Sequence, residues 1–129
     1  MTTMYGYLIV FFGAGLGGAL RHLTNLVTQR ALGPDLPVST LLVNVVGSLS
    51  LGAIAGHFAL RGHGSQALQL FLTTGILGGF TTFSAFGNET MNLWRDGQNA
   101  LAALNIAAHL VLGLGAVWIG RALAYQIWR

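Results

Sequence analysis

The sequence predicts an all-α integral membrane protein with four transmembrane helices. Of its 129 residues, 53% are hydrophobic and only 7% are charged, whereas soluble domains carry roughly 25% charged residues. The apolar residues form four segments, and each meets the ~20 residues that a helix needs to cross the hydrocarbon core of a bilayer. Short turns containing Gly, Pro and Asp separate the segments. We therefore expect one domain, residues 1–129, built from four antiparallel helices in a lipid bilayer.

Composition also excludes several classes of function. The chain has no cysteine, so it can form neither disulfides nor a thiolate metal site. The net charge of +3 comes from six arginines scattered along the sequence, and without a basic patch a nucleic-acid partner is not expected. The sequence shows no nucleophile–base pair and no metal-ligand cluster, so we do not expect an enzyme.

The first predicted helix, residues 5–28, contains small residues at helical spacing and one arginine. Gly13 and Gly17 fit the G-x-x-x-G pattern that lets membrane helices pack closely. The same spacing recurs at Gly52/Gly56 and Gly75/Gly79 in the second and third segments. Arg21 lies near the far end of this helix, where its side chain either reaches the membrane surface or faces a wet vestibule and attracts anions.

The second predicted helix, residues 38–60, carries a polar stripe. Thr40, Asn44 and Ser48 recur at i, i+4 and i+8, so they share one face of an otherwise apolar helix. Amides and hydroxyls inside a membrane either join helices or line a pathway. A stripe that faces the polar run of the third segment favours a pathway.

The third predicted helix, residues 66–94, contains the run GILGGFTTFSAF at residues 75–86. Each glycine of the Gly78-Gly79 pair costs about 1 kcal/mol relative to alanine inside a helix, so we expect the helix to break there in mid-membrane. Such a break is tolerated only where protein satisfies the backbone or where it lines a wet cavity. Its two ends present carbonyl and amide groups, which suit ions.

Two aromatic residues and one carboxylate follow this pair in the same segment. Phe83 and Phe86 lie at i and i+3 on one helix face. They either pack in the core or turn their electropositive ring edges toward an anion. Glu89 is the only carboxylate within any of the four segments, and it could pair with an arginine or lie at a pore mouth.

The fourth predicted helix, residues 99–125, carries Asn105 and His109 at i and i+4. A histidine inside a membrane span can relay protons, donate a hydrogen bond to a permeant ion, or join two helices. The residues alone leave these three roles open for His109.

The arginines give no preferred orientation in the membrane. One side of the predicted bundle would hold Arg61, Arg121 and Arg129, and the other would hold Arg21, Arg30 and Arg95. Because orientation follows the excess of positive charge on the cytoplasmic side, a balance of three against three predicts insertion in both orientations. Two copies would then form an antiparallel dual-topology homodimer.

The residues of all four segments resemble the Fluc family of fluoride channels, also called CrcB. The resemblance includes GGALR at residues 17–21, TLLVN at residues 40–44 and, most specifically, the run at residues 75–86. It implies a multi-pass protein of the bacterial plasma (inner) membrane that exports cytoplasmic fluoride by passive permeation. The resemblance further implies two pores in an antiparallel homodimer, with a structural sodium ion at the dimer centre.

The resemblance also implies roles for individual residues. Asn44 would contact fluoride, and Phe83 and Phe86 would line the pathway with their ring edges. The other pathway residues would be Thr40, Ser84, Glu89 and His109, with Arg21 in the vestibule. The backbone carbonyls of Gly78 and Thr81 would hold the sodium ion. Two departures from the family concern Ala85, where many relatives have threonine, and the track of Asn105, His109 and Gly113, where some relatives have tyrosine and serines.

Two other functions compete with this interpretation. A small dual-topology, proton-coupled multidrug exporter has a similar length and helix number, but it uses a carboxylate in its first helix, and residues 5–28 contain none. An accessory subunit, whose glycine-rich faces serve only helix packing, would conduct no ions when purified.

Overall fold

The computed structural model describes residues 2–62 and 64–129 and is helical throughout apart from short connections. Four helical stretches in this part of the chain are long and apolar enough to cross a membrane. Their bounds are Thr3–Leu32 (α1), Val38–Arg61 (α2), Gln66–Arg95 and Asn99–Trp128 (α6). The third stretch comprises α3 (Gln66–Leu70), the π-helix η1 (Phe71–Leu77), α4 (Gly78–Phe80) and α5 (Phe83–Arg95). The all-α fold with four candidate spans is thus confirmed.

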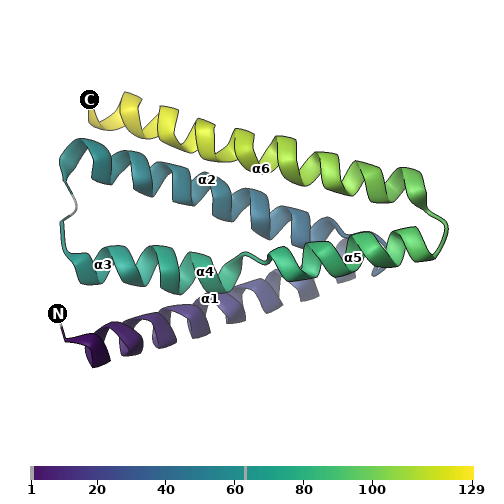
Figure 1. Cartoon of the computed structure of the whole chain (residues 1–129), viewed down its shortest axis with the longest axis horizontal. Helices are drawn as coiled ribbons and strands as arrows, with labels where there is room; N and C mark the ends of the chain where they lie inside the picture. The colour runs from purple at the N-terminus through teal and green to yellow at the C-terminus, as the bar shows by residue number, and fades with distance from the viewer. Residues whose placement is uncertain (1, 63) are drawn as a thin grey trace.

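The helices run alternately up and down along the long axis of the molecule (Figure 1). The two termini and the connection from α2 to α3 lie at one end, and the other two connections lie at the opposite end. The most extensive packing joins α2 to α6, and the next most extensive joins α1 to η1. Because α5 contacts both α2 and α6, the second half of the third stretch is held by the helices that carry the polar stripe and His109.

All four helical stretches extend beyond the apolar segments predicted. The helix α1 continues beyond residue 28 to Leu32, and it ends where Gly33 adopts a φ of 84°. Similarly, α2 ends at Arg61, and the following Gly62 has a φ of 82°. The ψ values of these two glycines are 166° and 167°, and this extended conformation with positive φ is one that residues with a side chain rarely adopt. The polar residues Gln29 and Arg30 therefore extend the first helix beyond its apolar part without ending it.

Close helix packing at the glycine pairs is confirmed. A side-chain Cβ on Gly17 would collide with the backbone carbonyl of Ile76 on η1. On the other side of the bundle, a Cβ on Gly52 would collide with the carbonyl of Val117 on α6. These backbones approach one another closely because no side chain intervenes, as expected for small-x-x-x-small motifs in membranes.

The third helical stretch changes conformation close to the predicted break, but at different residues. Gly78 has helical dihedral angles, φ −63° and ψ −38°. The extended residues are Thr81, with φ −84° and ψ 156°, and Thr82, with φ −153° and ψ 113°. Gly79 is instead used for packing, since a Cβ there would collide with the backbone of Ala14. The β-branched threonines accept an extended conformation readily, and α5 begins directly after them.

Candidate functional site

The amide of Asn44 on α2 binds both backbone polar groups of Thr82. Its Oδ1 accepts a hydrogen bond from the Thr82 N–H at 2.8 Å, and its Nδ2 donates one to the Thr82 carbonyl at 3.1 Å. The polar stripe predicted on the second helix therefore does face the polar run of the third stretch. Because an asparagine amide has two N–H groups, this contact leaves one of them for another acceptor.

The same region redirects two backbone N–H groups away from helical partners. In a continuous helix, the N–H groups of Thr82 and Ala85 would point at the carbonyls of Gly78 and Thr81, four residues earlier. Instead, the Thr82 N–H is donated to Asn44, and the Ala85 N–H is donated to the Thr82 hydroxyl at 3.2 Å. Thr82 is thus the N-cap of α5. The carbonyls of Gly78 and Thr81, which are expected to bind sodium, are among those that lose their usual helical donors at this point.

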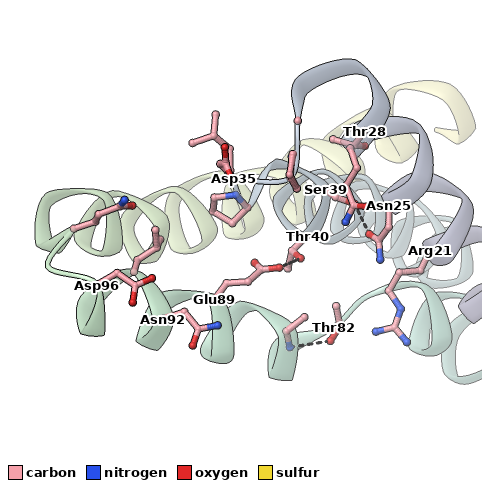
Figure 2. Close-up of a pocket in the computed structure, with 18 residues that line it drawn as sticks. Arg21, Asn25, Thr28, Asp35, Ser39, Thr40, Thr82, Glu89, Asn92 and Asp96 are labelled. Atoms are coloured by element: carbon pink, nitrogen blue, oxygen red, sulfur yellow. Dashed lines mark hydrogen bonds between the residues drawn. The ribbon is translucent and has the colours of Figure 1, made fainter.

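A cavity of about 620 Å³ opens between α1, the connection from α1 to α2, α2 and α5. We call it the Glu89 cavity; Arg21, Thr40 and Thr82 also line it (Figure 2). The Ser39 hydroxyl, also in its wall, donates a hydrogen bond to Oδ1 of Asn25. The cavity therefore combines one cationic side chain, Arg21, with three carboxylates, Asp35, Glu89 and Asp96, and several neutral polar side chains.

Glu89 and Thr40 point at one another across the Glu89 cavity (Figure 2). The Thr40 hydroxyl donates to Oε1 of Glu89 at 2.6 Å, and Thr40 is buried, with 5% of its surface exposed. The second carboxylate oxygen, Oε2, is buried and has no hydrogen-bond partner within the described residues. In the described part of the chain Glu89 forms no ion pair with an arginine, and it lines the wall of this cavity. Its position at a pore mouth stays a prediction.

A second cavity, of about 370 Å³, lies between α2, the third helical stretch and α6. We call it the Asn44 cavity. Its lining includes Asn44, Phe83, Phe86 and His109. The backbone segment with Gly78, Thr81 and Thr82 also belongs to the wall. Because Thr82 lines both cavities, the residue held by Asn44 stands between them.

The two phenylalanines of the Asn44 cavity differ in exposure. Phe83 has 83% of its surface exposed in the single chain, whereas Phe86 is half-buried. Their ring centroids are 5.4 Å apart with the ring planes at 60°. Phe86 also stacks at 4.3 Å against the imidazole of His109, with the planes at 39°. The aromatic face is therefore shared between α5 and α6.

Asn105 on α6 forms a side-chain hydrogen bond to α5, close to the Phe86–His109 pair. Its Nδ2 donates a hydrogen bond to the Thr90 hydroxyl at 2.9 Å, and that hydroxyl donates to the Phe86 carbonyl at 2.8 Å. The backbone carbonyl of Asn105 lies 3.0 Å from Nδ1 of His109. The pair predicted at i and i+4 therefore fixes both the position of α5 and the orientation of the imidazole.

The structure brings nearly all of the predicted site residues into the two cavities. Ser84 is the exception, because it is exposed and lines neither, although its hydroxyl lies 3.2 Å from that of Thr82. The prediction assigned no role to Thr82, which joins the cavities. Its position directly before a helical segment, where Ser and Thr are preferred as N-caps, is the signal that could have indicated it.

The sequence also matches a known protein family over most of its length. The model described as "CrcB-like protein, Camphor Resistance (CrcB)" matches residues 8–121. This chain belongs to the CrcB family. The matched region contains both cavities, including the residues that line them from α1, α2, α5 and α6.

Several CrcB relatives are similar along nearly the whole chain. A protein of Methylobacterium nodulans is 49% identical over 123 residues, which cover 95% of this chain and 98% of that protein. A protein of Rhodopseudomonas palustris strain BisB5 is 48% identical over 121 residues, covering 94% and 98%. One of Granulibacter bethesdensis is 50% identical over 114 residues, covering 88% and 90%. All three are named "Fluoride-specific ion channel FluC", which describes a channel and not an enzyme.

Membership of the CrcB family agrees with the four candidate spans. Helices of this length and apolarity, in a family whose relatives named above are bacterial ion channels, identify a multi-pass bacterial membrane protein. The apolar side chains exposed along α1 and α6, such as Phe11 and Trp118, are then surfaces for lipid or for a second protein chain.

Proposed function

We propose that this chain forms a fluoride-specific ion channel that exports cytoplasmic fluoride by passive permeation. The observation that carries the proposal is the extent of the similarity, since relatives named as fluoride-specific channels are 48–50% identical over 88% or more of the chain. The two cavities that meet at Thr82 supply a route that is consistent with such an activity.

The chemistry of the route suits a small, strongly hydrated anion. Fluoride must exchange its water for short hydrogen bonds, and the route offers the free amide N–H of Asn44. The Thr40 hydroxyl would join it by exchanging its bond to Glu89 for one to the ion, and Ser84, which lies outside both cavities, would contribute at the face that a partner covers. Arg21 lines the Glu89 cavity, where its positive charge would offset the repulsion of an anion by the carboxylates of Asp35, Glu89 and Asp96 in the same wall. Asn44 lies on the other side of Thr82, in the more apolar cavity with the aromatic residues.

Phe83 and Phe86 would stabilise the anion with their ring edges, where the aromatic quadrupole is positive. The two rings are neighbours at one wall of the Asn44 cavity. A wall of this kind favours an anion without a fixed cation in mid-membrane. The ring edges would therefore stabilise the anion without supplying a full opposite charge of their own.

A second copy of the chain would complete the site. Phe83 and Ser84 are exposed where the backbone leaves the helical conformation at Thr81 and Thr82. Non-helical backbone is not found facing lipid within the hydrocarbon region, so we propose that a partner covers this mid-membrane break. The three-against-three distribution of arginines over the two ends of the bundle favours an antiparallel, dual-topology homodimer with two pores.

A sodium ion at the centre of this dimer would bind the carbonyls of Gly78 and Thr81. Bare carbonyl oxygens suit hard cations, and the helical donors of these two carbonyls are diverted to Asn44 and Thr82. One chain supplies only this pair, whereas Ca²⁺, another hard cation, takes six to eight oxygen ligands. A symmetric partner would double the set, so the cation would stabilise the dimer and not the single chain.

Fluoride efflux from proteoliposomes that contain only this protein tests the proposed function. We expect rapid loss of internal fluoride when a fluoride gradient is imposed, and no loss of chloride under the same gradient. An accessory subunit would release neither ion. A proton-coupled multidrug exporter would instead move organic cations in exchange for protons. The helix α1, Thr3–Leu32, contains no carboxylate for that exchange.

A further inference from the structure

The tautomer of His109 follows from its hydrogen bond to α6. Its Nδ1 lies 3.0 Å from the backbone carbonyl oxygen of Asn105. A carbonyl oxygen can only accept a hydrogen bond, so Nδ1 carries the proton that is donated to it. In the neutral ring the other nitrogen, Nε2, is then a lone-pair acceptor.

This second nitrogen is buried without a partner. Within residues 2–62 and 64–129, Nε2 of His109 finds no hydrogen-bond donor or acceptor. Its ring stacks on Phe86 at 4.3 Å, and the residue lines the Asn44 cavity beside Asn44. A lone pair at this wall would repel a passing anion, whereas an N–H would bind it.

We propose that His109 binds fluoride in its protonated form and thereby couples fluoride conduction to pH. This inference rests on the proposed channel function. Proton uptake at Nε2 converts an acceptor into a charged donor, while Nδ1 keeps its bond to the Asn105 carbonyl in both states. Fluoride occupancy and flux therefore fall as rising pH removes the proton from Nε2.

The surroundings of His109 contain few competing charges. No other described residue lining the Asn44 cavity has a titratable side chain. Helix α6 packs on α2 and α5. On α5, Glu89 lines the other cavity and Arg95 is exposed near the end of the helix. On α2, Arg61 is exposed at the last position and His57 packs against Trp128 at 4.6 Å.

Coupling between the proton and fluoride is reciprocal. If protonation of His109 strengthens fluoride binding, then bound fluoride strengthens proton binding by the same factor. Entry of fluoride into the cavity therefore raises the fraction of channels in which Nε2 of His109 carries a proton.

Fluoride efflux measured between about pH 5.5 and 8 tests this coupling. Total fluoride is held constant, and the leak of HF through protein-free liposomes is subtracted at each pH. The wild-type rate should fall with rising pH, by up to about tenfold per pH unit, which is the limit for one coupled proton. His109→Gln retains an N–H donor that does not titrate, so its efflux should be nearly independent of pH.

His57→Gln is the matched control. His57 is also half-buried with an unpartnered ring nitrogen in the described chain, but it does not line the Asn44 cavity. Its variant should keep the wild-type pH dependence. Equal pH dependence in His109→Gln and the wild type, or a wild-type rate that does not change with pH, would overturn the inference while leaving the channel function intact. Absence of fluoride flux at every pH would defeat the proposed function and this inference together.

Nitrogen NMR of ¹⁵N-histidine-labelled protein in liposomes provides a test that needs no conducting variant. We expect Nδ1 of His109 to be protonated at every pH and Nε2 to gain a proton when fluoride is added near neutral pH. An Nε2 that stays unprotonated at saturating fluoride, or a proton on Nε2 alone, would overturn the assignment. The His109→Gln spectrum identifies the signals.

Discussion

The side chain of Asn44 replaces helical hydrogen bonding for Thr82, a residue 38 positions later in the chain. Both polar backbone groups of Thr82 are satisfied by this one amide, at 2.8 and 3.1 Å. Thr82 is buried, with 9% of its surface exposed, and stands between the two cavities. The residue predicted to contact fluoride therefore also holds the backbone beside which the ion would pass.

Replacing Asn44 with aspartate should abolish fluoride flux. An ionised carboxylate has no N–H for the anion, and it places an oxygen against the Thr82 carbonyl. The loss of a satisfied buried group should also destabilise the fold by about 1–3 kcal/mol, measured by denaturant unfolding in detergent. Ser48→Ala, one turn further along the same stripe and in the same cavity, should conduct more nearly normally. Wild-type flux in Asn44→Asp would contradict both roles of the amide.

The four helices, and most of the side chains that line the two cavities, were predictable from the sequence. The contacts between those side chains and other helices were not. Hydrophobic length and turn residues locate four helices, and the period of 3.6 residues places Thr40 and Asn44 on one face. Nothing in that period specifies which atoms of another helix the amide will meet, because the register between α2 and α5 depends on packing along both helices. The Asn44–Thr82 contact and the role of Thr82 therefore emerge only in three dimensions.

The Gly78-Gly79 pair illustrates a second limit. Low helix propensity predicts a break at these glycines, but glycine also permits close approach between helices, and propensity cannot tell the two uses apart. Here Gly79 packs against the backbone of Ala14, and the preceding residue, Gly78, has helical dihedral angles. The extended conformation falls on Thr81 and Thr82, where a distant side chain captures the backbone.

Replacing Phe83 or Phe86 with isoleucine should severely reduce fluoride flux. Isoleucine keeps bulk and hydrophobicity but removes the electropositive ring edge. Phe83 is 83% exposed in the single chain, so Phe83→Ile should leave the protomer as stable as the wild type. Fluoride-electrode recordings from liposomes, with size-exclusion chromatography as the assembly control, separate the two effects. Normal flux in both variants with an intact assembly would show that the rings serve packing alone.

Thr40→Val should destabilise the protein by about 1–3 kcal/mol, because it removes the hydroxyl that donates to Glu89 and leaves the buried carboxylate without that bond. Glu89→Gln keeps an acceptor for Thr40 and should retain most of the stability. Thr24→Val is the matched control, since the Thr24 hydroxyl bonds only a carbonyl of its own helix in an exposed position. Unfolding curves in the same detergent compare the three variants. Equal stability of Thr40→Val and Thr24→Val would argue against an energetic role for the Thr40–Glu89 contact.

Removing sodium should weaken the dimer if backbone carbonyls bind a central cation. Replacing Na⁺ with a bulky organic cation should shift the protein toward single chains, as measured by cross-linking yield or single-molecule photobleaching. Thr81→Ala should keep this sodium dependence, since the proposed ligand is the backbone carbonyl and the hydroxyl only donates to the Leu77 carbonyl. A dimer equally stable with and without Na⁺ would count against the site.

Dual topology predicts that variants biased toward opposite orientations will complement each other. Gln66 and Asn99 are exposed, and each is the first residue of a helix, α3 and α6, at opposite ends of the bundle. Gln66→Arg and Asn99→Arg each change the arginine balance from three against three to four against three, and positive charge is retained on the cytoplasmic side. Each variant alone should therefore populate mainly one orientation, form few antiparallel dimers and lose fluoride flux several-fold. Co-expression should restore flux, because each variant then supplies the orientation that the other lacks. Accessibility of a tag on the C-terminus from both sides of the membrane checks the orientations directly, and a wild-type tag reached from one side only would exclude dual topology.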